Sequence, residues 1–222
     1  MKKIMILMVL ATASVVAQDR IEKNLGDFSE LKTYRGLQVE LIESDSPKIV
    51  IEGNKASSVT VKNVNGLLKI SMKIENTFSS DEVMTYLYYS DPISLIDANE
   101  GSNIYSDNTI KQDRVEVRAQ EGARIKLDLD VQKVEVVTST GGYINLSGTS
   151  ESQEVRANTG GIYKGADLKT SESTISAATG GNAEIFATKS VDAKASTAGI
   201  IDIKGDPEKV TKKESTGGNI ND

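Results

Sequence analysis

Apolar and polar residues alternate with a period of two along the C-terminal half of the chain, and the same pattern returns about every nineteen residues. Alternation of this kind predicts short β-strands that bury one face and expose the other to water. When the repeats are aligned, the apolar positions fall into columns. The clearest columns are Val117, Val136, Val155, Ile175 and Ala193, then Ala119, Thr138, Ala157, Ala177 and Ala195, and then Ile104, Ile125, Ile144, Tyr163, Ala183, Ile201 and Ile220.

A Thr-Gly-Gly step, or a degenerate copy of it, marks each repeat. From one step to the next the intervals are 19, 20, 18 and 19 residues, and weaker copies stand at Gly101 and Gly122. Because glycine reaches positive φ without a Cβ penalty, we expect the chain to turn at these steps between two strands. The predicted corner residues are Thr140, Gly141, Gly142, Thr159, Gly160, Gly161, Thr179, Gly180, Gly181, Gly199, Gly217 and Gly218.

Two strands per repeat, joined at glycine corners, predict an all-β fold: a parallel β-helix-like solenoid with coils of about 19–20 residues. One coil cannot bury its own apolar face, so the coils must stack. Right-handed coils follow from the general preference for right-handed connections between parallel strands. Equivalent side chains then lie over one another about 4.8 Å apart. This stacking predicts a core of valine and isoleucine ladders, an alanine ladder, and a threonine ladder at the corner.

The first seventeen residues differ in kind from the rest of the chain. Lys2 and Lys3 precede a short apolar run, and small residues follow up to Ala17. This order is typical of a secretory signal peptide, so we expect residues 1–17 to be cleaved off before Gln18. An uncleaved membrane anchor is the alternative, although the apolar run is short for a span. The sequence therefore predicts an exported protein, located in the periplasm, at the outer-membrane surface or outside the cell.

Charge and composition exclude several classes of function. Removal of residues 1–17, which carry two lysines and no acids, lowers the formal net charge from −6 to −8 and disfavours nucleic acid as a partner. The chain has no histidine and no cysteine, which removes Ser-His-Asp and Cys-His nucleophiles and His-ligated zinc. We expect no metal, no cofactor and no membrane span after signal removal.

Carboxylates are the catalytic groups that remain. A glycoside hydrolase needs two carboxylates that flank one bond. Asp128 and Asp130 alternate within one predicted strand, and Asp107 and Asp113 lie about one coil earlier. Two interpretations stay open: solvated acids on the outer face of a strand, which we favour, or the catalytic carboxylates of a β-helix carbohydrate-active enzyme.

Residues 18–92 carry strand patterns with a looser period, and we expect them to cap the solenoid or to form its first coils. The repetitive solenoid then comprises residues 93–222, continuous with this cap. An apolar and aromatic cluster precedes the solenoid. This cluster predicts either a sugar-stacking platform or, as we favour, cross-strand packing. Its residues are Met84, Tyr86, Leu87, Tyr88 and Tyr89.

These features resemble the head GIN domain family, described as "putative auto-transporter adhesins". The resemblance rests on the turns at Gly53 and Asn65-Gly66 and on the Thr-Gly-Gly units that end in Gly217-Gly218-Asn219-Ile220. It covers about residues 28–222. It implies an envelope protein of Gram-negative bacteria, built as a right-handed parallel β-helix-like stack, and it provides no catalytic residues.

The sequence thus predicts an exported, non-enzymatic β-solenoid that acts as an adhesin or envelope binding scaffold for glycan or protein. A stiff stack displays its outward side chains in aligned rows, such as those of Arg124, Lys126, Asp128 and Asn145. The alternatives are a polysaccharide lyase or hydrolase that uses clustered carboxylates, and a structural component that self-assembles. Exposed terminal coils make homo-oligomerisation a further expectation.

Overall fold

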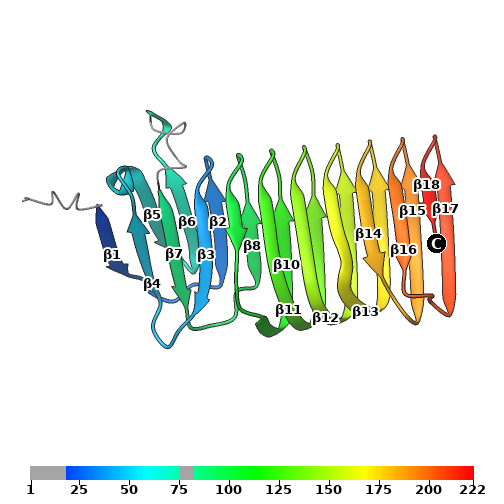
Figure 1. Ribbon diagram of the computed structural model, residues 1–222, viewed down its shortest axis with the longest axis horizontal. Helices are drawn as coiled ribbons and strands as arrows, with labels where there is room; N and C mark the ends of the chain where they lie inside the picture. The colour runs from blue at the N-terminus through cyan, green and yellow to red at the C-terminus, as the bar shows by residue number, and fades with distance from the viewer. Residues whose placement is uncertain (1–18, 76–82) are drawn as a thin grey trace, which may run out of the picture.

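The computed structural model describes residues 19–75 and 83–222, and it shows an elongated β-solenoid whose coils stack along one axis (Figure 1). The strands are accompanied by a short 3-10 helix, η1 (Ala56–Ser58). The predicted all-β parallel solenoid is confirmed. As far as the described residues go, no helix combines the length and the apolar character that crossing a membrane requires. The predicted signal peptide lies outside the described residues.

The coils have two faces, which we call the first and the second sheet. In spatial order, the first sheet contains β1 (Arg20–Asn24), β4 (Lys48–Glu52), β7 (Met84–Tyr89), β3 (Gln38–Glu43), β9 (Asn103–Tyr105), the first halves of β11 (Arg124–Thr138), β12 (Tyr143–Asn158) and β13 (Ile162–Ala178), then β14 (Asn182–Phe186), β16 (Ile200–Lys204) and β18 (Asn219–Asn221). The second sheet contains β5 (Val59–Val64), β6 (Leu67–Met72), β2 (Glu30–Tyr34), β8 (Leu95–Ala98), β10 (Ile110–Ala119), the second halves of β11, β12 and β13, then β15 (Ser190–Ser196) and β17 (Lys209–Ser215).

Parallel pairing keeps the coils in register, so equivalent side chains stack directly over one another. Val136 pairs with Val117 on one side and with Val155 on the other, as the predicted column requires. These three side chains are at most 1% exposed. Full burial of an aliphatic side chain stabilises a fold by about 1.5–3 kcal/mol, so the stacked columns between the two sheets form the core.

The corners at the Thr-Gly-Gly steps form one ridge of the solenoid, at the top of Figure 1. Thr159 and Gly160 have φ values of 49° and 70°, and two successive positive φ angles are the signature of a type I′ turn. The amide of Gly161 donates to the carbonyl of Asn158 across this turn (2.9 Å). Because the threonines are exposed at the tips, the predicted threonine ladder lies on the surface and not in the core.

Hydrogen bonds join neighbouring turns along this ridge. The amide of Gly141, for example, donates to the carbonyl of Thr159 in the next coil (3.3 Å). The same bond joins every neighbouring pair from Arg35-Gly36 to Thr216-Gly217. A non-glycine residue at positive φ costs about 1–2 kcal/mol. Each corner threonine carries this cost, and its carbonyl accepts a hydrogen bond from the neighbouring coil.

The second glycine of each step has a different role from the first. A Cβ on Gly142 would lie 2.0 Å from the carbonyl oxygen of Ala119 in the preceding coil. A Cβ on Gly141 would meet nothing within 4 Å. The first glycine therefore serves the turn conformation, whereas the second permits close approach of two coils.

One coil is a residue longer than most because it contains an irregularity. The register between β12 and β13 shifts between Asn145 and Ser147, which accounts for the 20-residue interval in the repeat. Gly165 lies at this point, and a Cβ there would come 2.3 Å from the ring of Tyr163. The tyrosine ring thus occupies the space that Leu146 and Ile185 fill in the neighbouring coils.

The N-terminal end departs from the simple order of the coils. The β2–β3 coil lies between β6–β7 and β8–β9, since β2 pairs with both β6 and β8. Beyond it, the pairs β1–β4, β4–β7 and β5–β6 are antiparallel. The parallel stack therefore gives way to antiparallel pairing at this end.

The final coil places charged residues at positions that are apolar in the coils before it. Lys212 is in register with Ala193, and Glu214 with Ala195. The Lys212 Nζ atom lies 2.6 Å from Asp222 Oδ1, and Glu214 Oε1 accepts the amide of Ile220 at 2.6 Å. Charges that point inward on an edge strand discourage pairing with another strand.

Replacing both of these charges should increase self-association. With Lys212→Val and Glu214→Ala, the apolar columns of the core would extend into β17. The edge of β17 would then carry no inward charge and could pair with a second copy. We expect a larger oligomeric fraction than in the parent chain at equal concentration, measured by analytical ultracentrifugation. Lys213→Val, which changes an outward residue of the same strand, is the control. Equal association of the double variant and the control would contradict this role of the inward charges.

Candidate functional site

Outward side chains of the solenoid form rows that run along its axis, because the parallel register repeats in each coil. On the first sheet the N-terminal rows are aromatic. On the second sheet the rows are charged or carry hydroxyl groups. The candidate sites are therefore surfaces that several strands share.

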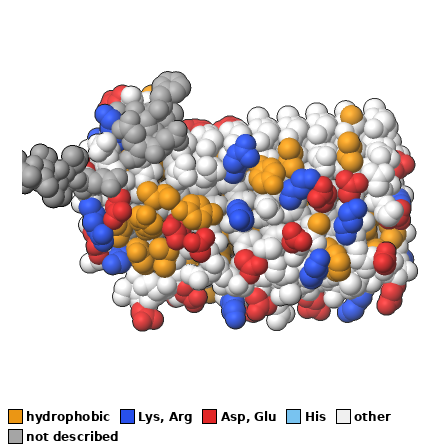
Figure 2. Space-filling model, in the orientation of Figure 1, with side chains coloured by type: hydrophobic (Ala, Val, Ile, Leu, Met, Phe, Trp, Pro, Cys, Tyr) orange, Lys and Arg blue, Asp and Glu red, His pale blue; other side chains and the backbone are white. Residues whose placement is uncertain are grey.

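An aromatic surface lies on the first sheet. Alternation along β7 points Met84, Tyr86 and Tyr88 outward and buries the residues between them. Tyr105 on β9 and Ile42 on β3 extend the patch, and all five are partly exposed. Figure 2 shows hydrophobic side chains gathered over the region of β3, β4 and β7. We call these five residues the tyrosine surface.

A carboxylate lies in the middle of the tyrosine surface. Glu40 on β3 is in register with Tyr86 on one side and with Tyr105 on the other. The Tyr105 hydroxyl donates to Glu40 Oε2 (3.2 Å). Burial, together with the charge of Glu40, raises the pKa of Tyr105 to about 12, so the phenol keeps its proton and its donor role.

A lysine lies at the border of the same surface. The Nζ atom of Lys48 is 5.0 Å from the centroid of the Tyr88 ring, within the range of a cation–π contact. The same atom lies 3.0 Å from Glu22 Oε1. Apolar ring faces, a carboxylate acceptor and an ammonium donor thus occur together on one sheet.

The remaining residues of the predicted aromatic cluster face the core. Leu87 is fully buried, and Tyr89 is 7% exposed. Burial raises the pKa of Tyr89 to about 12. The strand therefore divides the cluster, with Met84, Tyr86 and Tyr88 available to a ligand.

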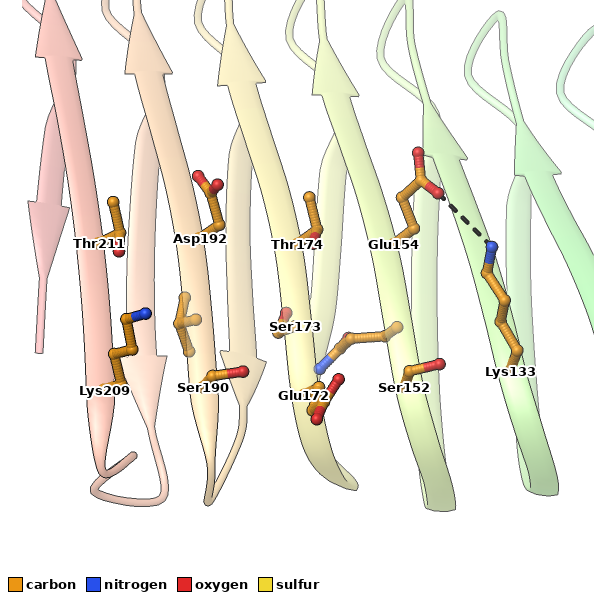
Figure 3. Close-up of a pocket in the computed structure, with 12 residues that line it drawn as sticks. Lys133, Ser152, Glu154, Glu172, Ser173, Thr174, Ser190, Asp192, Lys209 and Thr211 are labelled. Atoms are coloured by element: carbon orange, nitrogen blue, oxygen red, sulfur yellow. Dashed lines mark ion pairs between the residues drawn. The ribbon is translucent and has the colours of Figure 1, made fainter.

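A polar groove of about 340 Å³ lies on the second sheet (Figure 3). Ser152, Glu172 and Ser190 stack across it in one row. Lys133 lies at one end, 2.9 Å from Glu135 and 3.7 Å from Glu154. Its hydrogen bond lowers the pKa of Glu135. The groove offers hydroxyl and carboxylate groups for hydrogen bonding.

The candidate catalytic carboxylates do not form one cluster. Asp128 accepts hydrogen bonds from the hydroxyls of Thr109 (2.6 Å) and Ser147 (2.8 Å). Asp113 and Asp130 line one shallow depression at the corner of the coils, which Asp107 and Asp128 do not line. Within residues 19–75 and 83–222, no group of three or more acidic side chains is arranged to hold a metal ion.

The predicted outward row lies on the first sheet, beside the tyrosine surface. Lys126 on β11 is in register with Tyr105 on β9 and with Asn145 on β12. The Arg124 guanidinium lies 5.6 Å from the centroid of the Tyr143 ring. These residues form a mixed, polar row beside the tyrosine surface and are not part of it.

The fold and its stacked outward rows define a β-solenoid with a long, regular display surface. Residues 27–207 match the model of the family described as "Putative auto-transporter adhesin, head GIN domain", and the chain belongs to this family. The resemblance inferred from the sequence is confirmed. The sequence matches none of the curated proteins.

Three solved structures share the fold. A "putative adhesin" from Bacteroides fragilis is similar with a TM-score of 0.85 at 17% identity, covering 93% of this chain and 97% of that one. A "putative adhesin" from Parabacteroides distasonis gives 0.72 at 15%, covering 92% and 96%. A "Putative lipid binding protein" from the same species gives 0.65 at 19%, with the same two shares. At these identities the similarity shows the fold alone.

Proposed function

We propose that this chain is an exported, non-enzymatic adhesin-type scaffold that binds glycan through the tyrosine surface. The observation that carries the proposal is the placement of Glu40 between Tyr86 and Tyr105 on neighbouring strands. The predicted signal peptide and the family description support export and a location at the cell envelope. Asp107 and Asp128 lie outside the shallow depression that Asp113 and Asp130 line, which supports a binding role over the hydrolase alternative.

The chemistry of this surface suits a sugar ring. The C–H face of a pyranose packs on the apolar face of an aromatic ring, and its hydroxyls need polar partners at the ring edge. Tyr86, Tyr88 and Tyr105 provide ring faces, while Glu40 and Lys48 provide an acceptor and a donor. Because these side chains project from a rigid sheet, little ordering is needed on binding.

Removing a tyrosine ring should weaken glycan binding. We expect Tyr86→Ala and Tyr105→Ala each to raise the Kd of the best-bound glycan about tenfold, a loss of about 1.4 kcal/mol. The measurement uses residues 18–222 on an array of bacterial and host glycans, followed by titration of the hits and product analysis. Tyr143→Ala is the control, because Tyr143 lies on the same sheet outside the tyrosine surface.

The outcomes separate the competing functions. Saturable binding of intact glycan that depends on Tyr86 and Tyr105 supports the proposal. Cleaved glycan would replace it with the enzyme interpretation and direct attention to Asp113 and Asp130. Equal binding by the tyrosine variants and by Tyr143→Ala would remove the tyrosine surface as the ligand site.

A further inference from the structure

A row of basic residues runs along the second sheet for the length of the solenoid. The register places one outward position of each successive strand in line, from β5 at one end to β17 at the other. In spatial order this basic row is Lys62, Lys69, Lys32, Asp97, Arg118, Val137, Arg156, Ser176, Lys194 and Lys213. Asp97 is the one acid in the row.

The cations in the middle of the row already have acidic neighbours. Lys32 lies 3.0 Å from Asp97, and Arg118 lies 2.6 Å from Glu116 on its own strand. Arg156 pairs with Glu154 in the same way. The Arg118 and Arg156 pairs are partly exposed, so exchange of one carboxylate for another costs little there. Asp97 is buried, so Lys32 stays committed to it.

The cations at the N-terminal end have no such partners among the described residues. Lys62 and Lys69 are directly opposite each other in the antiparallel β5–β6 pair, and both are exposed. In the part of the chain that the structure describes, neither has an acidic side chain within ion-pair distance. Like charges opposite each other destabilise a sheet, and this chain has acidic residues in excess. The lysine pair therefore lowers the stability of the sheet when it is alone, and a bound anion would relieve the repulsion between the two charges.

A depression of about 270 Å³ surrounds this lysine pair. The hydroxyl-bearing residues Tyr34, Thr60 and Ser71 line it together with the two lysines. Burial raises the pKa of Tyr34, so its hydroxyl stays protonated. Arg35 and Glu100 also line it and form an ion pair with each other (3.5 Å).

From β10 to β15, cations recur on alternate strands, and Lys213 on β17 then directly neighbours Lys194. Arg118, Arg156 and Lys194 are on β10, β12 and β15, with Val137 and Ser176 on the strands between them. At a strand spacing of about 4.8 Å, the cations are about 10 Å apart. An extended polysaccharide with one acidic sugar per disaccharide spaces its charges on this scale.

We propose that the basic row binds a linear acidic polysaccharide that lies across the strands, with one anionic group held between Lys62 and Lys69. Glutamates beside the row, such as Glu116, Glu135 and Glu154, would repel a polymer with a phosphate at every unit. They tolerate one whose charges alternate with neutral hydroxyls. Repeated weak contacts along the row supply the affinity. This site is on the opposite sheet from the tyrosine surface and does not rest on the function proposed for it.

The test compares polymers on residues 18–222 by isothermal titration. The probes are hyaluronan, with one carboxylate per disaccharide, neutral dextran, single-stranded DNA, and vesicles of phosphatidylglycerol. We expect hyaluronan to bind, with an affinity that falls as salt rises. Lys62→Gln/Lys69→Gln and Lys194→Gln/Lys213→Gln should each weaken it about tenfold, because each removes two exposed charges that contribute modestly.

Lys126→Gln/Lys204→Gln is the matched control, since it removes the same charge from the first sheet. It should bind hyaluronan as the parent does. The proposal is overturned if hyaluronan does not bind, if dextran binds equally well, if DNA or the vesicles bind more tightly, or if the control loses as much affinity as the two lysine variants.

Discussion

Alanine in place of Gly142 is expected to destabilise the solenoid by about 3 kcal/mol or more, whereas alanine in place of Gly141 should cost about 1 kcal/mol. The Cβ added at Gly142 would lie 2.0 Å from the carbonyl oxygen of Ala119 and 2.5 Å from its carbon. That oxygen already accepts the amide of Ser139 (3.1 Å). Relief of the clash therefore requires two coils to separate at a point where they are hydrogen-bonded.

Gly141→Ala is the matched control because it changes the adjacent residue of the same turn. Gly141 has a φ of 72° and open space around its Cα, so alanine adds strain without a clash. Thermal unfolding of both variants measures the difference. In a chain of this size 1 kcal/mol shifts Tm by about 2–4 °C, so Gly142→Ala should lower it by about 6 °C or more. Similar Tm values for the two variants would show that the coils yield at Gly142 and that close approach is not the role of the second glycine.

Sequence reasoning found the repeat and the core because both depend on local periodicity. The Val117, Val136 and Val155 column was read directly from the alternation, and the structure pairs these residues as predicted. The same reasoning gave both glycines of each step one role. The role of Gly142 depends on the distance to Ala119 in another coil, which no local pattern encodes.

The N-terminal order could not be predicted for a similar reason. The strands of residues 30–43 lie between strands that come later in the chain, since β2 pairs with β6 and β8. Alternation predicts that these segments are strands, but it does not specify their neighbours. Lys62 and Lys69 lie on one hairpin, but Lys32 comes from a separate, earlier segment, so the basic row emerges only once this pairing is known.

The candidate sites were accessible from sequence in part. The cluster around Tyr86 and Tyr88 was visible as a run of aromatic residues, and alternation along β7 determines which of them face outward. Tyr105 and Glu40 complete the surface from β9 and β3, through pairings between distant segments. A site shared by several strands needs the order of the strands before its members can be named.

Leucine in place of Gly165 should destabilise the parent chain by about 3 kcal/mol or more. In a chain that already carries Tyr163→Ile, the same leucine should add little further cost. A Cβ at Gly165 would lie 2.3 Å from the Tyr163 ring. Without the ring, leucine would fill the column between Leu146 and Ile185, and isoleucine at 163 would continue the column of Ile144. The two positions thus exchange volume within one coil.

A double-mutant cycle measures this exchange. Tyr163→Ile alone should also destabilise, because the buried hydroxyl donates to Gln153 Oε1 (3.0 Å) and its loss leaves that oxygen unpaired at a cost of about 1–3 kcal/mol. The double variant should therefore be more stable than Gly165→Leu, with a coupling energy of about 2 kcal/mol or more from denaturant unfolding. Additive effects of the two substitutions would mean that the ring and the glycine do not share one space, and that the extra residue of this coil has another cause.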